Sequence, residues 1–502
     1  MIGEFAFDEC ENLLSATIPN GIIEIERAAF AGCKSLTNIA IPDSVTEINF
    51  AAFAGCENLK SITIPNSVTE IGENAFAGCK SLTSITIPDN VTEIGSSTFE
   101  RCENLTNIII PNSITKIGAS AFEGCKKLKS ITIPNSVTWI GGSAFRNCIN
   151  LKRITIPDSV TWIGGGAFCW CESLTDITIP NSITKIEFAT FGSCKDLTRI
   201  TIPNSVTEIR EFAFSKCGNL RKITIPDSVT RIENGAFSGC KSLTSITIPD
   251  SVTEIGDFAF SGCKNLKNIT IPDSVTRIGK GTFRGCKNLV RFNGKFSADN
   301  GRCIIIDNDI IAYAAQSGVD YNIPYGVTNI GIDTFFGCNN LTSITIPDSV
   351  TIIEKGAFSW CENLTNITIP DSVIEIYGYA FGECKNLRTI NIPEGITTIR
   401  WSTFRGCKNL FGITIPNSVR EIEAYAFCRC KNLSSITIPS SVYRIEEFAF
   451  GGCENLSSIT IPRKKVVETL DNYKTQFVMH IPSDVIEINF GAFEGCPAFE
   501  TE

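Results

Sequence analysis

Residues 243–265 read LTSITIPDSVTEIGDFAFSGCKN, and close copies of this 23-residue unit follow one another along almost the whole chain. The prolines of the units stand 23 residues apart from Pro42 to Pro272, and again from Pro324 to Pro462. Self-similarity at a fixed period of this length is typical of a solenoid, in which each repeat buries its apolar side chains only against its neighbours. The 502 residues are therefore predicted to form one elongated, continuous solenoid.

Each repeat combines two strand patterns with turn signals. The I-T-I stretch alternates apolar and polar residues as a half-buried strand does, and the proline and Asp or Asn after it end the strand in a turn. V-T-E-I is a second, shorter alternating stretch, and A-F-x-G-C is too short for a stable α-helix but suits a short 3₁₀ or single-turn helical segment. The pattern predicts a mainly β rung with a parallel sheet, a short second strand and a tight turn.

The same unit, as in residues 243–265, closely resembles the BspA-like, or treponemal-type, leucine-rich repeats, from Ile2 to about Phe499. The resemblance implies a right-handed, curved solenoid with a parallel sheet on its concave side. It also implies a family of bacterial and protist surface proteins, several with roles in adhesion, and hence a cell-surface or secreted location. The start of the chain, MIGEFAFDEC, carries no signal-peptide pattern, which leaves the cytoplasm open as an alternative.

An insertion at 293–322 interrupts the period and separates an N-terminal repeat block, 1–292, from a C-terminal block, 323–502. Within it, residues 303–306 and 310–313 flank the turn-forming sequence Asp-Asn-Asp, which predicts a β-hairpin. This hairpin is either a structural protrusion of the kind the family resemblance implies or a dedicated ligand loop.

A second break falls at 463–480, where apolar residues recur at helical spacing from Val466 to Phe477. We expect a variant rung with a real helix there. Lys464 and Lys465 are interpreted as a solvated face, the alternative being a patch that binds lipid or nucleic acid.

Of the 23 cysteines, 20 occupy the same position of the repeat. Equivalent residues on neighbouring rungs lie about 4.8 Å apart with parallel side-chain directions, which does not suit the roughly 3.8 Å between Cβ atoms of a relaxed disulfide. We therefore expect a column of reduced, buried thiols. Cys169 and Cys428 each precede a column cysteine by two positions and are expected to face outward.

Composition and motifs argue against several classes of function. A net charge of -9 disfavours nucleic acid as a partner, and no apolar run is long enough to cross a membrane. His480 is the single histidine, so neither a histidine-rich metal site nor a catalytic triad is indicated, and no phosphate-binding loop is present. We expect a protein that is not an enzyme and needs no cofactor or metal.

Against mostly Thr, Ser and Asn on the expected concave sheet, a group of basic residues stands out in neighbouring repeats: Lys129, Lys152, Arg153, Arg199, Arg221 and Lys222, with Lys267 and Arg291 more distant. This basic group suits an acidic protein surface or an acidic glycan. The alternative is that these charges only discourage aggregation of an exposed sheet, with Asp176 neutralising part of the group.

Trp139 and Trp162 replace the usual Glu at the same position of two consecutive repeats. They form a second candidate contact for a protein or sugar, the alternative being mutual stacking for stability. Together these features predict a non-enzymatic binding or adhesion solenoid that is a monomer rather than an oligomer. The alternative is a structural module that assembles into rods or filaments.

Overall fold

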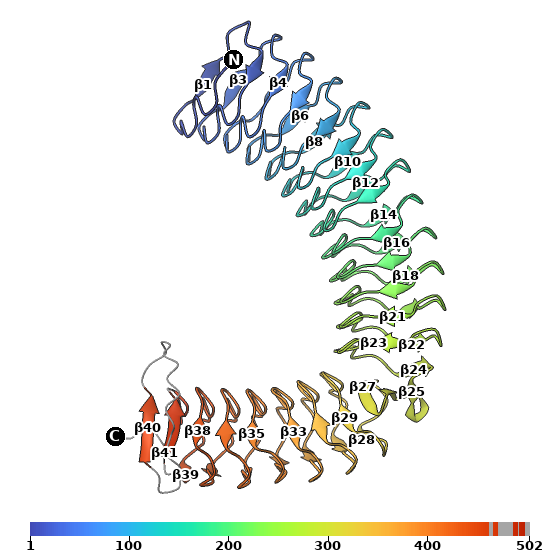
Figure 1. Ribbon diagram of the computed structural model, residues 1–502, viewed down its shortest axis with the longest axis vertical. Helices are drawn as coiled ribbons and strands as arrows, with labels where there is room; N and C mark the ends of the chain where they lie inside the picture. The colour runs from blue at the N-terminus through green and yellow to red at the C-terminus, as the bar shows by residue number, and fades with distance from the viewer. Residues whose placement is uncertain (461–464, 470–484, 490, 497–502) are drawn as a thin grey trace. The chain divides into compact units, whose positions relative to one another are not determined.

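The computed structural model describes residues 1–460, 465–469, 485–489 and 491–496, and the chain folds into two compact units. Unit 1 comprises Met1–Cys263 and Pro272–Gly279, and unit 2 comprises Lys264–Ile271 and the described residues from Lys280 onward. In each unit the repeats form rungs that stack side by side (Figure 1). Apart from one short 3₁₀ helix, the described residues contain only strands and turns, so the predicted mainly β solenoid is confirmed.

The I-T-I part of most repeats forms a strand that pairs in parallel with its counterpart one repeat away, as Ile131 does with Ile154. The central isoleucine points inward and its two neighbours point outward, because side chains alternate along a strand. We call these strands the first sheet of each unit. In unit 1 they are β1 (Ser15–Thr17), β3 (Asn38–Ala40), β6 (Ser84–Thr86), β8 (Asn107–Ile109), β10 (Ser130–Thr132), β12 (Arg153–Thr155), β14 (Asp176–Thr178), β16 (Arg199–Thr201), β18 (Lys222–Thr224) and β20 (Ser245–Thr247). In unit 2 they are β22 (Asn268–Ile271), β24 (Arg291–Gly294), β28 (Asp320–Asn322), β30 (Ser343–Thr345), β32 (Asn366–Thr368), β34 (Thr389–Ile390), β37 (Ser435–Thr437) and β39 (Ser458–Thr460).

The V-T-E-I part forms the second sheet, whose strands also pair in parallel from rung to rung and are two residues long, except for the five-residue strands β40 and β41. In unit 1 these strands are β2 (Glu24–Ile25), β4 (Glu47–Ile48), β5 (Glu70–Ile71), β7 (Glu93–Ile94), β9 (Lys116–Ile117), β11 (Trp139–Ile140), β13 (Trp162–Ile163), β15 (Lys185–Ile186), β17 (Glu208–Ile209), β19 (Arg231–Ile232), β21 (Glu254–Ile255) and β23 (Arg277–Ile278). In unit 2 they are β29 (Asn329–Ile330), β31 (Ile352–Ile353), β33 (Glu375–Ile376), β35 (Thr398–Ile399), β36 (Glu421–Ile422), β38 (Arg444–Ile445), β40 (Lys465–Thr469) and β41 (Val485–Asn489).

The A-F-x-G-C segment forms a series of single turns rather than a continuous 3₁₀ helix. Its backbone N–H groups alternate between two kinds of acceptor. The N–H of Cys240 donates to the carbonyl of Phe237 within the same turn (3.1 Å), whereas the N–H of Phe237 donates to Ala259 of the next rung (2.8 Å). Half of the backbone donors of the segment therefore tie neighbouring rungs together, which a helix could not do because it would use them internally.

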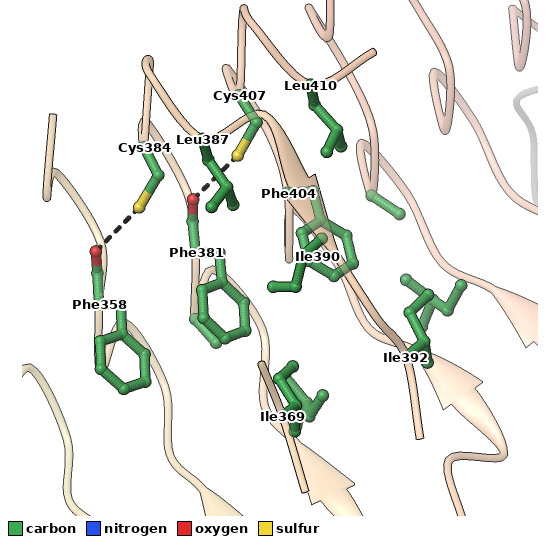
Figure 2. Close-up of a cluster of buried hydrophobic side chains, with 14 of the residues drawn as sticks. Phe358, Ile369, Phe381, Cys384, Leu387, Ile390, Ile392, Phe404, Cys407 and Leu410 are labelled. Atoms are coloured by element: carbon green, nitrogen blue, oxygen red, sulfur yellow. Dashed lines mark hydrogen bonds between the residues drawn. The ribbon is translucent and has the colours of Figure 1, made fainter. Parts of the chain in front are cut away.

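The core of each unit is a set of columns in which every repeat contributes the same side chains. Phe214, Phe237 and Phe260 stack with ring centroids 5.4 and 5.6 Å apart, and all three are fully buried. Figure 2 shows the same arrangement in unit 2, where Phe358 and Phe381 stack 5.2 Å apart beside columns of Cys, Leu and Ile. Burial of one such ring contributes about 1.5 to 3 kcal/mol, so the stability of a rung depends on having a rung on either side.

All 23 cysteines are free, as predicted. The thiol of a column cysteine donates to the carbonyl of the phenylalanine in the preceding rung, as Cys384 does to Phe358 (3.1 Å; Figure 2). Burial raises the pKa of these thiols, to about 12 for Cys240 and Cys361. The column therefore consists of neutral, hydrogen-bonded thiols that serve as core residues.

The insertion contains β25 (Ser297–Ala298), the 3₁₀ helix η1 (Asp299–Gly301), β26 (Cys303–Ile306) and β27 (Asp309–Tyr313). β26 and β27 pair antiparallel, and the turn between them uses Asp307 and Asn308 at positive φ. β27 then pairs in parallel with β29, so the hairpin extends the second sheet of unit 2 instead of standing apart from it. Its interior is closed by Tyr313 and Tyr321, whose rings lie 4.5 Å apart.

The helix predicted from Val466 onward is wrong at its start, because Lys465–Thr469 is strand β40, paired in parallel with β41. Three of its five residues are β-branched, which favours a strand, and β41 supplies backbone partners that a helix would not need. The rest of the predicted helix and His480 lie outside the described residues.

Candidate functional site

The basic group lies on the first sheet of unit 1. Arg153, Arg199 and Lys222 are the first residues of β12, β16 and β18. Lys129, Lys152 and Arg221 directly precede β10, β12 and β18, and all six side chains are exposed. Arg153, Arg199 and Lys222 point outward because the isoleucine that follows each of them along the strand is held in the core. These three lie on the outward face of the first sheet, and the exposed Lys129, Lys152 and Arg221 lie beside them where the strands begin.

An acidic residue stands within this face. Asp176 lies in register with Arg153 on one side and with Arg199 on the other. None of the six basic side chains comes within 4.0 Å of a carboxylate of the described chain. Lys267 and Arg291, the more distant members expected from the sequence, belong to unit 2.

On the second sheet of the same unit, the basic side chains form ion pairs. Along its column of outward residues, Lys116 pairs with Glu93 (2.6 Å), Lys185 with Glu208 (3.2 Å) and Arg231 with Glu254 (2.7 Å). These cations are satisfied by the rung beside them, whereas the basic group is not. Unpaired cations in a protein of net charge -9 keep their attraction for an external anion.

The two predicted tryptophans lie on β11 and β13 of unit 1 and are in direct register. Their rings stack with centroids 5.3 Å apart at an angle of 19°, and Trp139 keeps 43% of its surface exposed. Stacking of this kind is worth about 0.5 to 1.5 kcal/mol, so it gives the pair a structural role. The surface that remains exposed is available to a partner, and the contact with a protein or sugar stays a prediction.

Few groups in the described residues suit catalysis or metal binding. No cluster of three or more His, Cys, Asp or Glu side chains that could hold a metal ion occurs in that part of the chain. Cys169 is partly exposed, as expected, but burial raises the pKa of its thiol in spite of Arg146 nearby. The expectation for Cys428 is wrong, because its side chain is buried, with 8% of its surface exposed.

One group of surface residues was missed by the sequence reasoning. All five tryptophans of the chain lie at least partly on the surface, and two of them, Trp360 and Trp401, meet Tyr379 in unit 2. Trp360 stands at a position that most repeats fill with Gly, but other repeats also carry Phe or Tyr at the position of Tyr379 and Phe at that of Trp401. The two tryptophans were the available signal, but their positions differ within the repeat and so do not form an obvious column.

Comparison with known proteins identifies the repeats. The sequence profile of the BspA-type leucine-rich repeat region (six copies) matches residues 1–128, 92–221, 207–298 and 309–434. No curated protein sequence matches the chain significantly.

Several solved structures are similar to the chain. A leucine-rich repeat protein of Eubacterium ventriosum is 26% identical, with 66% of this chain and 85% of that one covered and a TM-score of 0.55. A leucine-rich cell surface protein of Faecalibacterium prausnitzii is 31% identical, with 75% and 87% covered and a TM-score of 0.46. A leucine-rich repeat protein of Bacteroides ovatus is 29% identical, with 86% and 88% covered and a TM-score of 0.46. In the part of this chain that the structure describes, no helix has the length and apolar character needed to cross a membrane.

Proposed function

Because the chain belongs to the BspA-type leucine-rich repeat family, we propose that it is a non-enzymatic binding protein of the adhesion type. Its partner is an anionic macromolecule, either an acidic protein or an acidic glycan, held on the basic group of unit 1. The proposal treats the repeats as a rigid frame and the departures from the repeat pattern as the functional residues. The match to the sequence profile supports the proposed class of protein, and the unpaired basic residues on the first sheet of unit 1 support the proposed site.

The observation that carries the proposal is the contrast between the two sheets of unit 1. On the second sheet the cations pair with glutamates at 2.6 to 3.6 Å, but on the first sheet six cations gather without an ion pair. Strands about 4.8 Å apart place such charges close enough to act together on one anionic chain. Their background of Thr and Ser offers hydroxyl groups but no competing negative charge except Asp176.

A cell-surface location is part of the proposal. The Faecalibacterium prausnitzii relative, 31% identical over 75% of this chain, is described as a cell surface protein. Extended repeat surfaces suit adhesion because many weak contacts along a rigid frame add up to a strong one.

The proposal is tested by reversing three charges of the basic group, with Arg153→Glu, Arg199→Glu and Lys222→Glu in one variant. We expect binding to immobilised heparin and to polyglutamate to be lost in this variant. For the wild-type protein it should weaken steeply with salt, because the screening length falls from about 10 Å at 0.1 M to about 3 Å at 1 M.

The matched control reverses the paired cations Lys116, Lys185 and Arg231 of the second sheet, which changes the net charge by the same amount. This control should retain binding. Equal losses in both variants would mean that only net charge matters, and full affinity in the first variant would place the site elsewhere. Filaments in dilute solution, with neither probe bound, would favour the assembly alternative.

A further inference from the structure

Three aromatic side chains from three consecutive rungs of unit 2 form a continuous surface cluster. The rings of Tyr379 and Trp401 are nearly parallel, with centroids 6.2 Å apart and an angle of 16°. Burial raises the pKa of Tyr379 overall, although the side chain of Trp360, one rung earlier, is close enough to the Tyr379 hydroxyl group to lower that pKa. Trp360 and Trp401 keep 38% and 43% of their surfaces exposed, so the cluster presents its rings to solvent. We call Trp360, Tyr379 and Trp401 the aromatic platform.

The backbone opposes two of these aromatic residues. Trp360 has a φ of 61° and Tyr379 a φ of 62°, in the left-handed region. Gly337 takes the position equivalent to Trp360 in the preceding rung, with a φ of 67°, and Ser402 takes that of Tyr379 in the next rung. A side chain costs about 1 to 2 kcal/mol in this conformation, and a bulky one is uncommon there. The rings therefore stand where glycine would be easier for the fold.

The ring of Trp401 occupies space that is free because residue 378 is a glycine. A Cβ atom at Gly378 would lie 2.4 Å from Nε1 of Trp401 and 2.6 Å from Cε2, so the indole lies directly against the bare backbone. Gly378 is not among the residues with positive φ, so its backbone does not require glycine. Space for the indole is what distinguishes glycine from alanine here, and Trp401 lies against the rung with 43% of its surface exposed.

Charged groups of both signs surround the platform. The ammonium group of Lys385 lies 5.3 Å from the ring centroid of Trp360 and pairs with Glu362 at 2.9 Å. Lys355 lies 5.1 Å from the ring centroid of Trp401. Glu383 and Arg405 are close enough to Tyr379 to act electrostatically on its hydroxyl group. The rim thus offers hydrogen-bond donors and acceptors with nearly balanced charge.

From this arrangement we propose that the aromatic platform is a binding site for an uncharged glycan. A pyranose ring has a flat face of C–H groups that stacks on an aromatic ring, and hydroxyl groups at its edge that pair with Lys, Arg and Glu side chains. The site goes beyond the basic group, since it lies in the other unit and requires no anion. Parallel rings on successive rungs suit successive sugars of one chain.

The size of the platform favours a glycan over a protein. A large aromatic side chain offers roughly 150 to 250 Å², so three that are less than half exposed present about 300 Å² at most. A standard protein interface buries about 800 Å² on each partner, around a desolvated centre. The charged rim begins immediately beside the rings and leaves no such apolar surround.

The test is affinity electrophoresis of the full chain in native gels that contain laminarin, xylan, galactomannan or dextran. We expect at least one of these polysaccharides to retard the wild-type protein. Trp360→Ala and Trp401→Ala should each weaken the apparent affinity about tenfold. Gly378→Ala keeps every aromatic residue but displaces the indole, and it should weaken binding as Trp401→Ala does.

Trp170→Ala is the matched control, because Trp170 occupies the same repeat position as Trp360, with a φ of 64° and 39% exposure, in unit 1. It should migrate as the wild type does. Failure of all four polysaccharides to retard the protein would overturn the proposal. So would equal retardation of the Trp401→Ala variant, or a displayed peptide library whose binding depends on Trp401 while the polysaccharides fail.

Discussion

At the scale of single residues, the repeat imposes a backbone conformation that most side chains tolerate poorly. Two positions of every turn segment lie in the left-handed region, and one of them is usually glycine, as at Gly239 with a φ of 75°. Lys216 occupies the equivalent position one rung earlier with a φ of 61°. Non-glycine residues at these positions therefore reduce stability. Each of them either has a function that offsets this cost or is a position where a change to glycine should stabilise the protein.

This strain gives a paired prediction. Lys216→Gly should raise the free energy of unfolding by about 0.5 to 1 kcal/mol, because relief of the left-handed strain exceeds the entropy that glycine adds to the unfolded chain. Gly239→Ala should lower the free energy of unfolding by about 1 kcal/mol, because alanine is strained in this left-handed conformation. The nearest neighbour of the added Cβ is the flexible Lys216 side chain at 3.3 Å, which can move aside. Urea unfolding measures both. Shifts of the same sign would contradict the argument.

At the scale of the structural element, the thiol column shows how one side chain per rung builds a continuous feature. Most thiols of the column are neutral, buried and hydrogen-bonded to a phenylalanine carbonyl, as Cys263 is to Phe237 (3.3 Å). A thiolate in the same place would lose its hydration without gaining a cation, which is why the pKa rises. The column therefore stabilises the fold at neutral pH, and this stabilisation is lost at alkaline pH.

Stability should fall in alkaline solution under reducing conditions. The folded-state pKa values, about 11 for Cys33 and about 12 for Cys240, lie above the ordinary value of 9.0. The stabilising contribution is therefore complete below pH 9 and is lost as the pH rises toward 12, by about 1.4 kcal/mol per pH unit for each thiol involved. Urea midpoints at pH 7, 9 and 10.5 measure this loss.

Cys240→Ala is the control for that measurement, because it removes one thiol and should flatten the alkaline slope. A midpoint that does not change up to pH 10.5, or a slope that Cys240→Ala leaves unchanged, would show that the thiols are not what titrates.

At the scale of the whole molecule, two compact units each depend on contacts between neighbouring rungs. Solenoids of this kind are stabilised by nearest-neighbour interfaces, so damage to one rung spreads only as far as its coupling to the next. Binding residues on the surface of a rung can change without disturbing the core, which is how one frame accommodates both the basic group and the aromatic platform.

Phe237→Ala tests this locality. The ring is fully buried between Phe214 and Phe260, so its loss should cost about 3 to 5 kcal/mol and expose the amides of the adjoining rungs. Hydrogen exchange should quicken in those rungs of unit 1 and stay unchanged around Phe381 in unit 2. Phe258→Ala, which removes a ring that is 38% exposed, should cost less than about 1 kcal/mol. Faster exchange throughout both units would instead indicate one cooperative structure.

The sequence by itself determined the period, the two strands of each rung, the inward columns of Phe, Cys, Leu and Ile, and the face that carries the basic group. These follow because a fixed repeat places equivalent residues side by side. Tertiary structure alone decided that Lys116 pairs with Glu93 while Arg153 stays free of a carboxylate, and that Lys465–Thr469 is a strand. It also decided that Trp360, Tyr379 and Trp401 meet, because their separate repeat positions converge only through the left-handed turns and the space left at Gly378.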